Sequence, residues 1–341
     1  MTTANSTFDI AGGVPRFEPH PWIRGGNAQT IVSRYLPGRR SHLVSTSHRV
    51  PIGDDESVCV LESIPEGWTS GNPSAVLVHG LAGCARSPYV VRTAARLVEN
   101  GVRVVRMNLR GAGQGFGLAR GFYHGGRTTE LRRVVEWMAG REPTSPIGLV
   151  GFSLGANLVL KLAGETTPDE LPNVDCVVAA NPPIDLAECC RHLQQPGNRI
   201  YDRNFVKLLR AEVRRLHKRF PELGSLDLTQ VRSLYEFDDT YTAPRNGFQG
   251  ALDYYEQSSS VRYLSRIRVP GLVVHAADDP FIPVEVFHRA EFPPNVTLEL
   301  IPAGGHLGYF SRSSWEGDRR WLEARLATWL RLHWGRPPAH G

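Results

Sequence analysis

One serine stands where a buried strand is expected to turn directly into a helix. Ser153 follows the apolar run 147–150 and precedes the segment 156–162, whose apolar residues recur at helical spacing. Gly151 and Gly155 flank it two residues away on each side, and a side chain at either position would collide with so tight a turn. This arrangement is typical of a nucleophile elbow, which lifts a hydroxyl clear of the sheet edge. The start of the following helix also favours negative charge that develops nearby.

A serine hydroxyl is a weak nucleophile at neutral pH, so it needs a base within hydrogen-bond reach. The candidate base is His306, which follows the predicted strand 296–301 on a loop rich in glycine. Such a loop could carry the imidazole over the serine, because glycine allows unusual backbone angles. His79, His124 and His275 are the other histidines with a local claim, and His275 is expected in the core because it lies within a predicted strand.

The base needs a carboxylate to orient it. Asp279 comes just after the apolar run 271–275 and directly precedes the turn 280–283, so we assign it as the acid. Asp278 is the alternative at this position. Either aspartate could instead cap the helix expected at 284–290, since capping is a common role for this residue type.

Backbone donors are needed to hold the oxyanion that forms when a serine attacks a carbonyl. One expected donor is the N–H of Leu154, the residue after the nucleophile. The second is expected from the loop that follows the apolar run 75–78, where Leu81 lies beyond His79 and Gly80. Gly80 permits the tight backbone that such a loop requires.

The elements that must position these residues alternate along the chain. Continuous runs of Val, Ile and Leu are typical of strands that are covered on both faces, and helical patterns separate them. The predicted fold class is therefore α/β, with a mostly parallel, doubly wound sheet. We expect strands near 58–63, 74–79, 102–108, 147–152, 174–180, 271–276 and 296–301, and helices over 87–99, 128–138, 154–164, 284–290 and 313–333.

The stretch between residues 181 and 270 breaks this rhythm, because it contains no strong buried strand. Within it, Phe205, Leu209 and Leu216 lie near one face of a predicted helix with basic residues opposite. We expect a helical insertion over the carboxyl edge of the sheet, where ligands bind in open α/β folds. The predicted segments are an N-terminal extension (1–50), a first core part (51–183), a helical cap (184–266), a second core part (267–335) and a flexible tail (336–341).

Composition limits the function classes. The chain has 341 residues, of which 41% are hydrophobic and 21% charged, so a sizeable core can form. It has neither an apolar run of 18 residues nor a signal-like start, and we expect a cytoplasmic protein. Five cysteines without metal-like spacing argue against a disulfide framework or a metal site. The net charge of +5 is modest and does not indicate a nucleic-acid partner. The basic face of the helix near Phe205 is more typical of a solvated surface than of a weak peripheral contact with a membrane. The oligomeric state is not predicted.

With these motifs in place, the chain resembles the α/β-hydrolase superfamily, in which the serine, the acid and the histidine follow one another in this order. More narrowly, it is similar to the YheT-like branch, which is related to the eukaryotic α/β-hydrolase-domain lipases and the plant embryogenesis-associated hydrolases. The similarity runs from about Phe17 to Trp334. It is carried by Phe17-Glu18-Pro19, Trp22–Asn27, Gln29-Thr30, Asn108–Gly111, Tyr123–Gly126, Phe237–Asp239, Gly247-Phe248, Asp253–Tyr255, Asp278–Phe281 and Gly304–Gly308.

The resemblance implies hydrolysis of carboxylic esters, such as acylglycerols, phospholipids or medium-chain esters, without a metal or organic cofactor. Some members of the branch pass the acyl group to an alcohol, so an acyltransferase with the same three residues stays open. A non-catalytic lipid-binding protein is the alternative from another class. The expected partner is a small-molecule or lipid ester. Asn27-Ala28 stands where relatives usually show His-Leu, and Glu130 stands where Asp is expected, which weakens any transfer of substrate preference.

Overall fold

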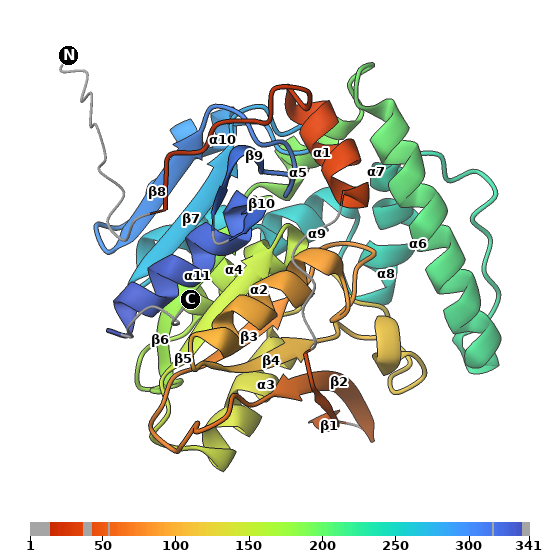
Figure 1. Ribbon diagram of the computed structural model, residues 1–341. Helices are drawn as coiled ribbons and strands as arrows, with labels where there is room; N and C mark the ends of the chain where they lie inside the picture. Colours follow the sequence, from red (N-terminus) through yellow and green to blue (C-terminus); the bar gives the residue numbers. More distant parts are fainter. Residues whose placement is uncertain (1–13, 37–42, 54, 316, 336–341) are drawn as a thin grey trace.

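The computed structural model describes residues 14–36, 43–53, 55–315 and 317–335. The tail expected over 336–341 lies outside the described residues. A central eight-stranded sheet has the order β1-β2-β4-β3-β5-β6-β7-β8, and a separate hairpin pairs β9 with β10 (Figure 1). The strands are β1 (Thr46–Gly53), β2 (Glu56–Ser63), β3 (Ser74–Val78), β4 (Arg103–Met107), β5 (Ile147–Phe152), β6 (Val174–Ala180), β7 (Gly271–Ala276), β8 (Val296–Ile301), β9 (Phe310–Trp315) and β10 (Asp318–Arg320).

The sheet is mostly parallel. All pairs from β4 through β3, β5, β6 and β7 to β8 are parallel, whereas β1 and β2 are antiparallel to their neighbours. Strands β3, β5 and β7 are buried along their whole length, as their continuous apolar runs predict. The predicted fold class, an α/β-hydrolase fold with a doubly wound sheet, is confirmed.

Helices cover both faces of the sheet (Figure 1). One core layer contains apolar residues of α2 and α11, and the other contains those of α3 and α4. The helices are α1 (Gly26–Tyr35), α2 (Pro88–Glu99), α3 (Thr128–Arg141), α4 (Leu154–Glu165), α5 (Leu186–Leu193), α6 (Arg199–Arg219), α7 (Leu234–Phe237), α8 (Ala243–Arg245), α9 (Ala251–Ser258), α10 (Glu285–His288) and α11 (Trp321–His333), with a π-helical turn at Asp238–Thr242. Every helix in the described part of the chain lacks either the length or the apolarity needed to cross a bilayer.

The helix predicted over 313–333 is wrong in its first turns. Phe310–Trp315 and Asp318–Arg320 pair as the β9–β10 hairpin, and α11 begins only at Trp321. The N-terminal segment pairs with the outer side of β9, because His20 N–H donates to Phe310 O at 3.0 Å and Arg312 N–H donates to Glu18 O at 2.7 Å. Pairing with a segment almost 300 residues away has overridden the local helical pattern.

Strand β1 was not predicted, because it is an exposed edge strand with only Val50 fully buried. It runs across the boundary expected between residues 50 and 51, so we propose that the core begins at Thr46. The helices from α5 to α9 all lie between β6 and β7, and we propose to keep this stretch, residues 184–266, as the cap. Its longest helix, α6, contains the predicted amphipathic segment, and Leu209 and Leu216 are buried as expected.

Candidate active site

Ser153 occupies a strained turn between β5 and α4. Its φ of 51° and ψ of −122° are uncommon for a residue with a side chain. The turn is so tight that a Cβ on Gly151 would lie 2.3 Å from Gly155 O, and one on Gly155 would lie 2.3 Å from Val78 O. A Cβ on Gly80 would lie 2.9 Å from the Cβ of Ser153. These three positions accept only glycine because backbone or the serine itself fills the space.

His306 lies over this serine. Its Nε2 is 2.9 Å from Ser153 Oγ, and its Nδ1 is 2.8 Å from Asp279 Oδ2. Asp279 is a hydrogen-bond acceptor when ionised, so Nδ1 carries a proton and Nε2 is free to accept the serine proton. The structure therefore brings the three sequence-predicted residues together in the order that proton transfer requires.

The two neighbouring aspartates have different surroundings. Asp279 also accepts hydrogen bonds from the N–H groups of Phe281 (2.8 Å) and Ile282 (3.3 Å). Burial would raise its pKa, but the charge and hydrogen bond of His306 hold the pKa below the ordinary value. Asp278 instead accepts from Gly305 N–H at 2.8 Å, and burial raises its pKa. Asp279 thus faces the imidazole as a carboxylate, whereas Asp278 holds the loop that carries the imidazole.

Asn181 was not identified from the sequence as part of the site. It follows β6 with φ of 46°, and its Nδ2 donates to Asp279 Oδ2 at 2.7 Å and to Gly305 O at 3.2 Å. It therefore ties the acid to the histidine loop. Its place directly after the buried run 174–180 was the available signal, since the carboxyl ends of parallel strands share one edge.

Helix α1 supports the histidine loop from the other side, which the sequence patterns also did not reveal. Thr30 Oγ1 accepts the His306 N–H at 2.8 Å and donates to Gly26 O at 2.6 Å. The backbones touch here, because a Cβ on Gly305 would lie 2.3 Å from Gly26 O and one on Gly308 would lie 2.4 Å from Gln29 O. Gln29 and Thr30 belonged only to the motifs that carry the resemblance.

The predicted oxyanion donors lie beside the serine, and both line the same cavity. Among the described residues, the N–H groups of Leu81 and Leu154 have no hydrogen-bond acceptor. The neighbouring groups are occupied: Gly80 N–H donates to Tyr89 Oη at 3.0 Å, and Ala82 N–H donates to Tyr123 Oη at 2.7 Å. Two open donors next to a nucleophile can hold an anionic oxygen.

His79 fixes the backbone of this loop. Leu109 N–H donates to its Nε2 at 3.1 Å, so Nδ1 carries the proton and donates to Gly80 O at 2.7 Å. Burial lowers the pKa of His79 to about 4, and the ring is neutral at physiological pH. His275 is a core residue, as expected, and stacks on Phe287 with ring centroids 4.1 Å apart.

A cavity of about 730 Å³ lies between the sheet edge and the cap and is lined by both Ser153 and His306. Most of its wall is apolar, and the cap supplies a large share of it through residues of α5, α6 and α7: Leu186, Leu193, Phe205, Leu209, Leu234 and Phe237. This mostly apolar space, part of which is open to solvent, suits a hydrocarbon chain beside the nucleophile. Polar side chains besides Ser153 and His306 also line it, among them Tyr123, His124, Asp238, Thr242, Tyr254 and Tyr255.

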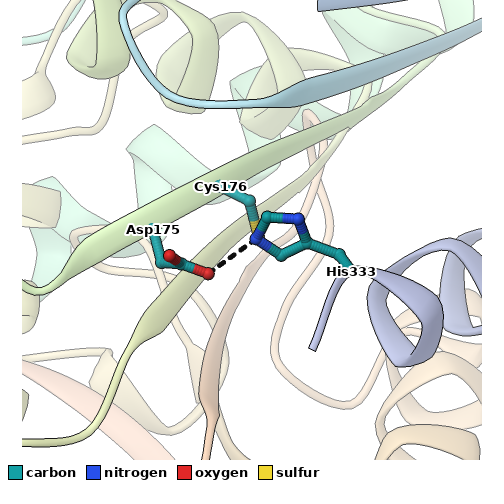
Figure 2. Close-up of side chains that lie close together, drawn as sticks. All are labelled: Asp175, Cys176 and His333. Carbon is teal, nitrogen blue, oxygen red and sulfur yellow. Dashed lines mark hydrogen bonds and ion pairs between the residues drawn. The ribbon is translucent and has the colours of Figure 1, made fainter. Parts of the chain in front are cut away.

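In the part of the chain that the structure describes, a cluster of residue types that can bind metal lies outside this cavity. Single ligand atoms of Asp175, Cys176 and His333 are within 4.8 Å of one another (Figure 2). Asp175 Oδ2 is 2.7 Å from His333 Nε2 and accepts from Trp334 Nε1 at 2.8 Å, and burial raises the pKa of the Cys176 thiol. The group lies near the start of β6, while Ser153 lies past the other end of neighbouring β5. We interpret it as an anchor for the end of α11.

Comparisons with known proteins agree with this geometry. A family model described as alpha/beta hydrolase fold matches residues 73–313. YheT of Escherichia coli (strain K12) is 32% identical over 318 residues, which are 92% of this chain and 92% of that protein. Two Saccharomyces cerevisiae proteins are also similar. A monoacylglycerol lipase is 26% identical over 76% of this chain and 59% of its own length, and medium-chain fatty acid ethyl ester synthase/esterase 2 is 28% identical over 71% and 60%.

Proposed function

The chain belongs to the alpha/beta hydrolase fold family, and from this premise we propose that it is a serine carboxylic-ester hydrolase that acts through an acyl-enzyme. The resemblance to the YheT-like branch, inferred from its motifs, is confirmed by the similarity to the bacterial protein. The observation that carries the proposal is the continuous hydrogen-bonded chain from Ser153 Oγ through His306 to Asp279, at 2.9 and 2.8 Å.

In the proposed acylation step, His306 Nε2 takes the proton from Ser153 Oγ as this oxygen bonds to the ester carbonyl carbon. The carbonyl oxygen becomes an anion and accepts hydrogen bonds from the N–H groups of Leu81 and Leu154. Asp279 stabilises the imidazolium that forms. When the intermediate collapses, the alcohol leaves with the proton from His306 Nε2, and the acyl group stays on the serine.

Deacylation repeats these steps with water. His306 takes a proton from the water molecule, whose oxygen attacks the acyl-enzyme carbonyl, and then returns the proton to Ser153 Oγ as the acid leaves. No metal or organic cofactor takes part in these steps. The apolar cavity supports an acyl chain of short to medium length, or one derived from a lipid, as the bound group.

A series of nitrophenyl esters of increasing chain length tests the proposal directly. We expect hydrolysis by the wild type and a loss of about 10⁵-fold in kcat in Ser153→Ala, because the nucleophile is removed. A fluorophosphonate probe should label the wild type and not the variant. Circular dichroism serves as the control for folding. Substantial residual turnover in a folded Ser153→Ala would remove the serine from this role, and absence of probe labelling in the wild type would favour a lipid-binding protein.

Acyl transfer to an alcohol is the second candidate, because one of the similar yeast proteins is named as both an ester synthase and an esterase. The same acyl-enzyme would be attacked by an alcohol in place of water. Products formed in water with and without added ethanol separate the two functions. We expect free acid to dominate in both mixtures; an ethyl ester as the main product at low ethanol concentration would instead favour acyl transfer.

A further inference from the structure

His124 contributes a polar atom to the cavity that the proposed chemistry does not use. Its Nδ1 accepts the Gly126 N–H at 3.2 Å, so a neutral ring must carry its proton on Nε2. That Nε2 has no hydrogen-bond acceptor in the described part of the chain, and the atom keeps some accessible surface. The His124 ring lines the cavity, held between Phe248 and Tyr254 in two edge-on contacts with centroids 5.5 and 5.6 Å away.

The surroundings keep this ring neutral. Burial, followed by the charges of Arg127, Lys161 and Arg110, lowers the pKa of His124 to about 3. The ring therefore does not compete with His306 as a base. It presents a fixed N–H donor in a mostly apolar space, where an unpaired donor is costly and a partner is correspondingly valuable.

Tyr254 supplies a second donor beside it. Its hydroxyl oxygen accepts the Gly125 N–H at 2.9 Å, and burial raises the pKa of the phenol, so the hydroxyl keeps its proton. That proton has no acceptor within the described residues. Tyr254 belongs to α9 of the cap and lines the same cavity. His124, from the core, and Tyr254, from the cap, thus form a donor pair at the boundary between these two parts.

The backbone next to the donor pair packs against Leu154, the residue that follows the nucleophile. A Cβ placed on Gly125, the residue next to His124, would be 2.9 Å from Leu154 Cδ1 and 3.2 Å from Tyr254 Oη. Asn157 Nδ2 donates to Gly125 O at 2.9 Å, which fixes this backbone to α4. A substrate whose carbonyl lies at Ser153 could therefore place another of its atoms against the pair.

From this geometry we infer that His124 and Tyr254 form a binding subsite for an acceptor oxygen of the substrate, separate from the ester carbonyl. The ligand class is an ester that bears a further hydroxyl or carbonyl oxygen, on its alcohol part or on its acyl chain. The pair would favour such an ester over a plain hydrocarbon ester of the same size, because only the first satisfies both buried donors. This inference rests on the proposed ester hydrolysis.

Four esters in two matched arms test it. Glycerol 1-monodecanoate against propyl decanoate places the oxygen on the alcohol side, and methyl 3-hydroxydecanoate against methyl decanoate places it on the acyl side. The quantity measured is the ratio of kcat/KM for the oxygen-bearing ester to that for its plain partner. We expect wild-type protein to favour the oxygen-bearing ester in at least one arm, and His124→Phe to lower that ratio about 10-fold, the usual range for a lost hydrogen bond. The arm that responds identifies the source of the oxygen.

Two further variants separate recognition from packing. His124→Gln restores a donor and should recover part of the ratio. Tyr254→Phe removes the second donor but keeps the aromatic ring against His124, and should also lower the ratio. Active sites are counted with a fluorophosphonate, so that poorly folded protein does not enter the rates.

The possible results are distinct. Equal ratios in wild type and a folded His124→Phe overturn the inference, as does a wild type that prefers neither oxygen-bearing ester, a result that needs no variant. If the wild type hydrolyses none of the four esters and no nitrophenyl ester, the proposed function itself fails.

Discussion

The two ends of the cavity differ in how many of their polar groups have hydrogen-bond partners. At the sheet edge, both oxygens of Asp279 and both nitrogens of His306 have partners, and even the His306 N–H is bound by Thr30. On the cap side, the N–H of His124 and the hydroxyl proton of Tyr254 are open, within the described residues. Asp238, a residue of the cap like Tyr254, is buried, and burial raises its pKa to about 7.

The difference separates reaction chemistry from substrate choice. A proton relay works only if each member has one orientation and one tautomer, so full pairing of His306 and Asp279 is a functional requirement. A binding wall can leave donors unpaired until the substrate arrives, which makes the bound substrate part of the polar network. Variants at each end should therefore fail in different ways.

The largest expected effect distinguishes the two neighbouring aspartates. Asp279→Asn should lower kcat about 10⁴-fold, because an amide can hold the imidazole in the wrong tautomer. Asp278→Asn keeps an acceptor for the Gly305 N–H and should lower kcat less than about 10-fold. Initial rates on a nitrophenyl ester, corrected for folded protein, measure both. Equal losses in the two variants would contradict the assignment of Asp279 as the acid.

A smaller effect is expected where α1 supports the histidine loop. Thr30→Val is nearly isosteric but removes the acceptor of the His306 N–H, so the loop should shift and kcat should fall about 10-fold. Thr30→Ser keeps the hydroxyl and is the matched control. The rate of fluorophosphonate labelling should follow kcat, since it reports the activation of Ser153. A valine variant as fast as the serine variant would show that the pairing at this end is less critical than we argue.

The smallest effect concerns the stability of the cap. Asp238 accepts hydrogen bonds from the hydroxyls of Tyr255 and Thr242, at 2.7 Å each. The charge of Asp202 adds to burial in raising the pKa of Asp238. The folded carboxyl, with a pKa of about 7, holds its proton where the unfolded one, with a pKa of 3.8, has lost it. Its contribution is thus full below pH 3.8 and is lost as pH rises toward 7.

Asp238→Asn should remove this dependence. Between pH 4 and 7.5, the Tm of the wild type should fall relative to that of the variant by on the order of 5 °C. Glu212, whose pKa burial raises to about 7, acts in the same pH range but is common to both proteins, so it cancels in the difference. Parallel Tm curves would mean that Asp238 is charged in the folded protein at neutral pH.

Much of the fold could be predicted because its central strands are buried on both faces. Strands β5, β6, β7 and β8 begin and end where their apolar runs predict. Two of the strands that were missed have different causes: β1 is an exposed edge strand, and β9 pairs with residues 18–20, which are distant in sequence. Neither leaves a continuous apolar run in the sequence.

The site, too, has residues that local sequence patterns predict and residues that they do not. The sequence suggested Ser153, His306 and the two aspartates, because each follows a buried strand at the same sheet edge. It favoured Asp279 over Asp278 only because Asp279 directly precedes the turn 280–283. One peptide unit separates the two residues, so the three-dimensional position of the imidazole is needed to decide between them. The open donors of His124 and Tyr254 could not be predicted for a related reason. Whether His124 is satisfied depends on the distant helix α9.

Helix α1 has a consequence for how much chain the enzyme needs. The part of the sequence that matches the family model, residues 73–313, contains Ser153, Asp279 and His306. A fragment trimmed to this range would lack residues 26–35, which contact the His306 backbone. The shortest piece that can still be recognised as this fold is therefore shorter than the shortest piece expected to turn over substrate.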